Sequence, residues 1–439
     1  MIQQIAFVLT LAIAFYFIRK RALRIRDNIG LGKAAEIKDH VAERLRNTIL
    51  VALGQQKMFK RPVPALLHLM IYVGFLVINL EVLEFIIDGV AGTHRVFAPY
   101  LGSFYNVLMN VFEFLALAVL ISCIAFLFRR NVLKVPRFRM YEMTAWPRLD
   151  ANIILITEIV LMLAILTMNA SDQILQRSHP QYTATGKLYI SSVLVPLLES
   201  APVSTLVFIE RFAWWFHIIG ILAFAVYITY SKHLHIFLAF PNTYFSRVEP
   251  KGEMSNMPVV TGEVRSMLGL ANETAPSDTA PGRFGARDVN DLAWNNLLAA
   301  YSCTECGRCT AACPANITGK KLSPRKIMMD TRDRMEDVGK SVASGGPGLQ
   351  DGKTLLGDYI TKEEINACTS CNACVEACPV LINPLDTILE LRRYVAMEES
   401  GSPPAWNSMF QNIETNFAPW KFPPSDRFKW AEKVITKEN

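Results

Sequence analysis

The first 231 residues of the chain contain five long runs of apolar residues separated by polar segments. The runs lie near residues 2–18, 64–87, 104–128, 151–169 and 206–231. A helix needs about 20 predominantly apolar residues to cross a lipid bilayer, and the runs are close to that length or longer. The pattern therefore predicts five membrane-spanning helices that form a bundle over residues 1–245.

The pattern changes after this bundle. Residues 246–289 are rich in Ser, Pro, Gly and Thr without sustained periodicity, which predicts a linker. Helical patterns then return; they cover 290–302 and begin again at Pro324 and Pro384. No strand pattern emerges, so the predicted fold class is all-α, with a second helical domain over 290–400. Residues 401–439 form a tail dense in Trp and Phe, which predicts a docking surface or a loop wrapped on its own domain.

Composition and charge indicate how the bundle sits in a membrane. Hydrophobic residues make up 51% of the chain and charged residues 19%, with a formal net charge of +6. Lys and Arg number twelve in 19–63 and six in 129–149, but one in 88–103 and two in 170–205. Because cytoplasmic loops are enriched in these residues, the N-terminus is predicted outside and the C-terminal half in the cytoplasm. Positive charge placed beside apolar runs also argues against a nucleic-acid partner.

The second domain contains two copies of one cysteine pattern. The pattern Cys-x2-Cys-x2-Cys-x3-Cys-Pro runs from Cys303 to Pro314 and again from Cys368 to Pro379. Bacterial ferredoxins with two [4Fe–4S] clusters have this spacing, and the fourth Cys of each run ligates the other cluster. The predicted ligands are Cys303, Cys306, Cys309 and Cys378 for cluster 1, and Cys368, Cys371, Cys374 and Cys313 for cluster 2.

Zinc sites and disulfides are the alternative uses of clustered cysteines. Zinc needs four ligands, usually as two separated pairs, and has no use for the third and fourth Cys or the Pro. Clusters therefore explain the spacing better. Their thiolates need a reducing compartment, so this domain is expected in the cytoplasm, in agreement with the charge pattern. The ninth cysteine, Cys123, lies in an apolar run and is predicted to pack in the core.

Four histidines fall within or beside the predicted spans: His68, His217, His233 and His235. A membrane histidine is costly without a partner, and in a helical bundle we expect that partner to be a haem held by two imidazoles. On one continuous helix His217 and His235 would share a face about 27 Å apart, with His233 nearly opposite. They cannot then hold the same iron, so His68 is predicted to be a ligand. His235 is its preferred partner and His217 the alternative; four histidines that pack without haem are the competing interpretation.

Four carboxylates also fall within the spans, where a charge is expensive: Glu81, Glu84, Glu113 and Glu158. Two interpretations remain open. They relay protons to a quinone pocket, or they pair with neighbours such as Arg211 and Asn110.

These motifs resemble those of known membrane redox proteins. The segments CTECGRCTAACPANITGKKLSPRKIMMDTR and CTSCNACVEACPVLINPLDTILELRR are similar to the iron–sulfur subunits of heterodisulfide reductases and anaerobic glycerol-3-phosphate dehydrogenase. The membrane half resembles the b-type cytochrome (gamma) subunit of respiratory nitrate reductase. SKHLHIFLAFPN is similar to membrane iron–sulfur oxidoreductases built on that domain, including the membrane partners of electron-transfer flavoprotein. The resemblance implies a bis-histidine haem b, a quinone substrate such as menaquinone, and the bacterial inner membrane.

The resemblance implies a membrane electron-transfer subunit that links a cytoplasmic redox partner to the quinone pool. Quinone reduction would be its own catalytic step. The nitrate reductase type has two histidines on its second span, whereas this span has only His68, so one haem is expected and a second stays open. Related fused proteins continue into cysteine-rich CCG domains. The chain ends at Asn439 without one, so a separate CCG-domain subunit or electron-transfer flavoprotein is the expected partner. The alternatives are a heterodisulfide-type reductase subunit driven by quinol, and a redox sensor or anchor without turnover.

Overall fold

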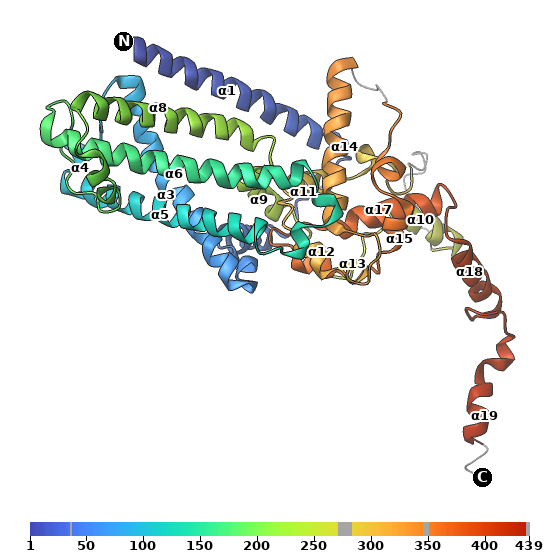
Figure 1. Cartoon of the computed structure of the whole chain (residues 1–439). Helices are drawn as coiled ribbons and strands as arrows, with labels where there is room; N and C mark the ends of the chain where they lie inside the picture. The colour runs from blue at the N-terminus through green and yellow to red at the C-terminus, as the bar shows by residue number, and fades with distance from the viewer. Residues whose placement is uncertain (36, 271–282, 346–350, 436–439) are drawn as a thin grey trace.

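The computed structural model describes residues 1–35, 37–270, 283–345 and 351–435. Within these residues the regular structure is helical, with two isolated β-bridges and no strand. The predicted all-α class is therefore confirmed. Figure 1 shows a bundle of long helices at one end of the molecule and a domain of shorter helices at the other.

Five helices are long and apolar enough to cross a membrane, as the hydropathy pattern predicts. They are α1 Ile2–Ile29, α3 Pro62–Ala91, α5 Ser103–Asn131, α6 Trp146–Ser178 and α8 Val203–Ile228. Four of them are longer than the apolar runs that predicted them, because polar residues continue each helix beyond its apolar centre. We call the end of the bundle that meets the C-terminal domain the domain end, and the opposite end the far end.

The long helices pack through a shared apolar core. α6 lies against both α5 and α8, α3 lies against α5, and α1 lies against α3 and α8. Cys123 is fully buried in this core, as predicted, with Phe85 and Trp214 among its other members. Gly89 lets α1 approach α3 closely, since a Cβ at this position would lie 2.5 Å from the ring of Phe7.

Short helices and turns connect the long ones. At the domain end they are α2 Val41–Asn47, the π-helical η1 Thr48–Leu53, and the 3-10 turns η2 Gln56–Lys60, η3 Pro136–Phe138 and η4 Tyr141–Met143. At the far end they are α4 Ala98–Leu101, η5 Ser191–Val193 and α7 Val195–Leu198.

The chain bends at the domain end of α8. The 3-10 turn η6 Lys232–Leu234 follows α8, and α9 His235–Tyr244 begins directly after it. Asp150 of α6 holds the bend, because its carboxylate accepts hydrogen bonds from Ser231 Oγ (2.6 Å) and the Lys232 amide (3.2 Å). The continuous helix predicted through His217 and His235 is therefore wrong. The separation calculated from that helix does not apply.

In the C-terminal domain, short helices and turns surround two longer helices. The longer helices, α14 Pro324–Gly345 and α17 Pro384–Met397, begin at the two predicted prolines. The short elements are η7 Val289–Asp291, α11 Trp294–Tyr301, α12 Arg308–Ala312, α13 Pro314–Ile317, η8 Leu355–Tyr359, α15 Lys362–Asn366 and α16 Ala373–Ala377.

The domain packs directly on the bundle. Its apolar core takes in Ile25 of α1 and Leu234 of η6. Arg21 of α1 forms a two-pronged ion pair with Glu336 of α14, at 2.5 and 2.9 Å. The two parts are thus joined by apolar and ionic contacts as well as by the connecting segment.

The connecting segment and the tail also contain helices. α10 Pro258–Met267 lies within the predicted linker, of which 271–282 are outside the described residues. Ala286 and Val289 are fully buried in the domain core, so the packing of this domain begins before residue 290. The tail forms α18 Pro404–Asn416, the turn η9 Pro424–Phe428 and α19 Lys429–Ile435, and it extends away from the body (Figure 1).

Candidate redox centres

The two cysteine runs fold in the same way. The third Cys of each run lies in a five-residue helix, α12 or α16, and these helices pack against each other. The residues on both sides of Cys306 and of Cys371 have positive φ, between 53° and 69°. Consecutive amides in such turns can point into a concave site. Because non-glycine residues rarely adopt positive φ, its repetition at equivalent positions indicates a functional demand on both loops.

Four cysteines from the two runs line one small cavity: Cys303, Cys306, Cys309 and Cys378. Three come from the first run and one from the second, the crossed combination that the spacing predicts for cluster 1. No three of the described His, Cys, Asp or Glu side chains converge as they would around a single ion. Four thiols around a cavity instead fit a [4Fe–4S] cube, which is ligated at its corners.

The other four cysteines are electrostatic neighbours. The Cys374 thiol interacts with Cys368, Cys313 and Cys371, and Cys313 interacts with Cys368 and Cys371. Cys371 is exposed, whereas none of the four cysteines in the first group is. The structure therefore brings together the four residues predicted for cluster 2, with one of them at the surface.

The cysteines are suited to bind metal rather than to react as free thiolates. Burial raises the pKa of Cys303 and Cys374 to about 12 and that of Cys378 to about 11. At neutral pH these thiols lose their protons only when a metal replaces them. Backbone amides point at two sulfurs: Ile382 N donates to Cys378 Sγ at 3.2 Å, and Ser370 N donates to Cys368 Sγ at 3.4 Å. Hydrogen bonds of this kind tune cluster potentials.

All four predicted histidines line one larger cavity of about 450 Å³, which we call the histidine cavity. His68 comes from α3, His217 from α8, His233 from η6 and His235 from α9. Burial lowers the pKa of His233 to about 3 and also lowers the pKa of His235. Both imidazoles are therefore neutral, as a metal-binding imidazole must be.

Three of these imidazoles have one nitrogen already engaged. The Nδ1–H of His68 donates to Gln55 Oε1 (3.0 Å), that of His217 to the Leu161 carbonyl (3.0 Å), and that of His235 to the Lys232 carbonyl (3.1 Å). The backbone carbonyls of Leu161 and Lys232 can only accept, so Nδ1 of His217 and of His235 must carry the hydrogen; the Gln55 amide, with its oxygen toward His68, holds that ring in the same way. This fixes the tautomer and leaves the Nε2 lone pair free, which is how iron-binding histidines are usually held.

The two cavities share a wall. Thr304, Cys306, Pro379 and Val380 line both of them. Lys232 connects the shared wall to the bundle. Its ammonium forms an ion pair with Glu305 at 2.6 Å, and its backbone carbonyl accepts the hydrogen bond from His235 Nδ1. Although burial opposes ionisation, Arg332 and Lys232 together lower the pKa of Glu305, so this buried carboxylate is ionised at neutral pH.

Sequence reasoning missed several residues of these sites. Gln55 lies in no motif. Glu305 lies inside the first cysteine run but is not a predicted ligand, and Lys232 was included only in the segment SKHLHIFLAFPN. The role of four arginines that line the histidine cavity was also missed: Arg129, Arg130, Arg137 and Arg308. Three of them lie in the basic segment 129–149, whose charge was interpreted only as an orientation signal. The available clue was their position in the sequence: Arg129 directly follows an apolar run, and Arg308 directly precedes Cys309.

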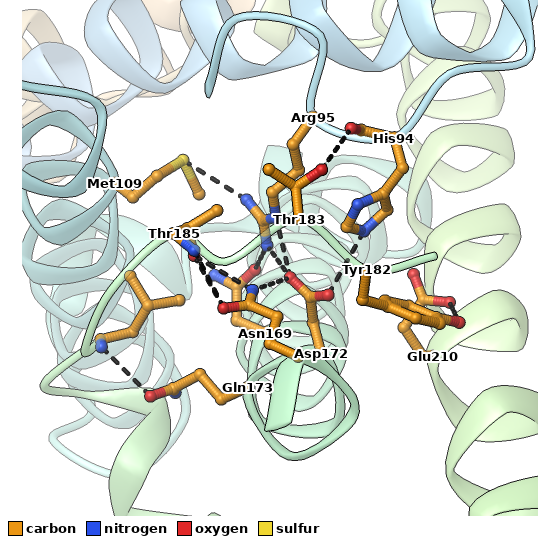
Figure 2. A network of polar contacts seen from close by, with 12 residues as sticks. His94, Arg95, Met109, Asn169, Asp172, Gln173, Tyr182, Thr183, Thr185 and Glu210 are labelled. Carbon is orange, nitrogen blue, oxygen red and sulfur yellow. Dashed lines mark hydrogen bonds and ion pairs between the residues drawn. The ribbon is translucent and has the colours of Figure 1, made fainter. Parts of the chain in front are cut away.

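A second polar network closes the far end of the bundle (Figure 2). Arg95 donates to Asp172 Oδ2 and Asn169 Oδ1, both at 2.8 Å, and His94 Nε2 lies 3.3 Å from Asp172 Oδ1. All three of Arg95, Asn169 and Asp172 are buried. The network joins the loop after α3 to the end of α6.

Two of the four span carboxylates belong to this polar end. Glu84 accepts hydrogen bonds from Tyr105 (2.6 Å) and the Phe97 amide (2.9 Å). Glu113 accepts hydrogen bonds from Asn169 and from the Ile190 and Ser191 amides, at 3.2, 3.0 and 3.2 Å. These groups are paired locally, although Arg211 and Asn110 are not the partners. Glu81 keeps one buried oxygen without a hydrogen-bond partner, and Glu158 lines the histidine cavity.

Comparisons with known proteins agree with the cysteine geometry. Residues 302–382 match the 4Fe-4S dicluster domain family. Over 96% of its length the chain is 28% identical to a probable iron–sulfur-binding oxidoreductase, FadF, of Bacillus subtilis, and over 91% it is 26% identical to the EtfAB:quinone oxidoreductase of Syntrophomonas wolfei. It spans 59% and 55% of the lengths of these two relatives.

A third relative matches a shorter segment. Over 23% of its length the chain is 35% identical to one subunit of the ferredoxin/F420H2-dependent CoB-CoM heterodisulfide reductase of Methanosarcina acetivorans, and the match spans 49% of that relative. No solved structure matches the chain. The chain is therefore a relative of iron–sulfur oxidoreductases, and it carries a 4Fe-4S dicluster domain beside five helices that are long and apolar enough to cross a membrane.

Proposed function

We propose that this chain conducts electrons between a cytoplasmic redox partner and a membrane quinone, through two [4Fe–4S] clusters and haem b. The observation that carries the proposal is the shared wall between the cavity lined by four thiols and the cavity lined by four histidines. Two redox groups bound on either side of such a wall would be separated only by a few side chains. The protein's own part in electron transfer is to fix that order and spacing.

For the clusters, the donor set supports the crossed assignment. Cluster 1 is proposed to bind Cys303, Cys306, Cys309 and Cys378, which line one cavity. Cluster 2 is proposed to bind Cys313, Cys368, Cys371 and Cys374, which are mutual electrostatic neighbours. Each bound cube supplies a one-electron couple. The surrounding amides and burial set where its potential lies.

For the haem, His68 and His235 are the preferred ligands. Their Nδ1–H groups are engaged, so both offer Nε2 to the cavity, and the two rings are electrostatic neighbours. His217 is held in the same way by Leu161 and is the alternative partner of His68, or a ligand of a second haem. His233 lies with its ring centroid 5.4 Å from that of His235 and contributes to the packing of the site.

The order of the redox centres is inferred from the exposure of their cysteine ligands. Cys371 of the second group is exposed, so a soluble partner would exchange electrons with cluster 2 first. Cluster 1 and the haem would follow, leading toward the spans and the quinone. The basic loops predict that the C-terminal domain lies on the cytoplasmic side of a bacterial inner membrane. The partner would then be a cytoplasmic protein. Because one relative is named an EtfAB:quinone oxidoreductase, electron-transfer flavoprotein is the first candidate, and a CCG-domain subunit is the second.

Variants of the three held histidines test the haem assignment. His68→Ala should abolish low-spin b-type absorbance in the purified protein while the iron–sulfur signals remain. His217→Ala and His235→Ala separate the pairings: loss in one variant names the partner of His68, and partial loss in both indicates two haems. A His68→Ala protein with its full haem content would refute the assignment.

A heterodisulfide-type reductase driven by quinol is the second candidate function. It is favoured by the similarity of the dicluster segment to part of a heterodisulfide reductase. Assays of the complex with a disulfide substrate and with reduced electron-transfer flavoprotein separate the two functions. A purified protein without haem, or with haem that quinol does not reduce, would instead indicate a redox sensor or an anchor.

A further inference from the structure

Four arginines line the histidine cavity. One of them, Arg130 of α5, interacts electrostatically with the carboxylate of Glu305. The other three share Arg61 as an electrostatic neighbour. They are Arg129 of α5, Arg137 of η3 and Arg308 of α12. Arg137 and Arg308 also interact electrostatically with Cys306. We call Arg61, Arg129, Arg137 and Arg308 the arginine cluster.

Two of the four charges in this cluster are buried without a carboxylate partner. Arg137 and Arg308 are 6% and 7% exposed, and the Nε of Arg137 is buried without a hydrogen-bond partner. Burial and repulsion from Arg61 lower the pKa of Arg137 to about 10. Within the described part of the chain, no carboxylate forms an ion pair with Arg129, Arg137 or Arg308. Lys232, on the same cavity, does have such a partner in Glu305 at 2.6 Å.

A buried group of like charges is costly unless an anion joins it. The cavity also dictates the shape of that anion. Its wall is largely apolar, it presents the Nε2 atoms of held imidazoles, and it presents guanidinium groups near the dicluster domain. A ligand that satisfies all three features is flat and apolar, binds imidazole through a metal, and carries negatively charged groups at one edge.

We propose that the arginine cluster binds the two propionate carboxylates of the haem, an inference that rests on the proposed haem site. Guanidinium groups bind carboxylates through two parallel hydrogen bonds, which gives orientation as well as affinity. Carboxylates held by Arg137 and Arg308 would lie on the side of the histidine cavity near Cys306. Arg137 and Arg308 line the histidine cavity and also interact electrostatically with Cys306, so they would stabilise both the haem carboxylates and the thiolate-ligated cluster.

The first test removes one charge at a time. Arg137→Gln and Arg129→Gln should weaken haem binding at least about tenfold, the effect of losing a hydrogen bond to a charged group. They should also shift the haem midpoint potential to more negative values, because a cation near the haem favours its reduced form. Arg137→Lys keeps the charge and should keep the potential while losing part of the affinity.

Arg139→Gln is the matched control. Arg139 belongs to the same loop but is exposed and does not line the cavity, so this variant should match the wild type. Iron–sulfur signals by electron paramagnetic resonance verify that each variant folds. If Arg137→Gln and Arg129→Gln retain wild-type haem affinity and potential, the proposal is overturned.

The second test identifies the anion. Full-length protein produced under haem limitation is titrated with haemin and with haemin dimethyl ester, whose carboxylates are blocked. The wild type should prefer haemin by at least about tenfold, and Arg137→Gln should lose most of that preference. Equal affinity for the two compounds in the wild type would overturn the proposal and point to another anion, such as a lipid phosphate. Failure of the wild type to bind either compound would instead refute the haem itself, and so the proposed function.

Discussion

Replacing Arg325 by Met should destabilise the junction between the bundle and the dicluster domain. Arg325 of α14 is completely buried, and its guanidinium donates to Glu142 Oε1 through Nη2 at 2.7 Å and through Nε at 3.2 Å. Its Nη1 donates to the Arg137 carbonyl at 2.7 Å. Glu142 and Arg137 belong to the loop between α5 and α6, so this one side chain holds a membrane-side loop against the domain.

The structure allows the size of the effect to be worked out. The side chain of Glu142 is 3% exposed, and its Oε2 already lacks a hydrogen-bond partner. Without Arg325 the carboxylate keeps only Ser323 Oγ, at 2.5 Å, and no cation. Removing one partner of a buried ion pair typically costs about 3–5 kcal/mol. In a domain of roughly 100 residues each kcal/mol shifts the thermal midpoint by about 4–8 °C, so this loss should lower the midpoint by at least about 10 °C.

The loop that carries the cluster 1 cysteines should also be destabilised by the loss of Arg325. Arg325 lines the cluster 1 cavity and lies under Gly307, where a Cβ would approach Arg325 Nη1 to 2.4 Å. Thermal unfolding of the purified protein in detergent, followed by circular dichroism and by loss of cluster absorbance, measures both effects. Absorbance from cluster 1 should disappear at the lowered temperature together with the domain.

Two variants serve as controls. Lys321→Met breaks an ion pair with Glu363 whose side chains are 69% and 63% exposed, so it should cost less than about 1 kcal/mol. The double variant Arg325→Met/Glu142→Leu removes both buried partners and should recover much of the lost stability. The reasoning fails if Arg325→Met melts at the same temperature as Lys321→Met.

Three further predictions concern the clusters, the shared wall and the membrane orientation. Cys309→Ala should remove one cluster, and with it about four irons per chain by elemental analysis, whereas an unchanged iron content would contradict the ligand assignment. Lys232→Met leaves Arg332 as the cation that pairs with Glu305. The variant should lose about 1–3 kcal/mol of stability, so the cluster 1 signal should disappear at a lower temperature than in the wild type. An unchanged temperature would mean that the pair of Lys232 and Glu305 does not stabilise the shared wall. A reporter fused after Asn439 should be active in the cytoplasm and one inserted near Thr93 should not, and the reverse pattern would exclude the proposed orientation.

Local patterns in the sequence predicted the elements that depend on local physics. Apolar runs long enough to span a bilayer identified five helices, and prolines at first helical positions identified the starts of α14 and α17. The duplicated cysteine spacing of two-cluster ferredoxins predicted the crossed grouping, and the structure places Cys303, Cys306, Cys309 and Cys378 around one cavity and the other four as electrostatic neighbours. Nothing in these patterns required knowledge of the tertiary fold.

The remaining features of the site depend on contacts between distant segments. Asp150 captures Ser231 and the Lys232 amide, and so ends the helix that carries His217 before it reaches His235. Gln55, which holds His68, comes from a turn 13 residues away. The carboxylates of Glu84 and Glu113 accept hydrogen bonds from backbone amides of other segments. Neither the hydropathy pattern nor the number of charges in a loop predicts such hydrogen bonds.

The most direct test of the proposed electron path is a combined measurement on the purified protein. Iron and haem are quantified per chain, and a reduced-minus-oxidised spectrum is recorded after addition of a menaquinol analogue. Two clusters predict about eight irons per chain, together with at least one low-spin b-type haem that the quinol reduces. About four irons, or a haem that is absent or does not respond to quinol, would contradict the proposal.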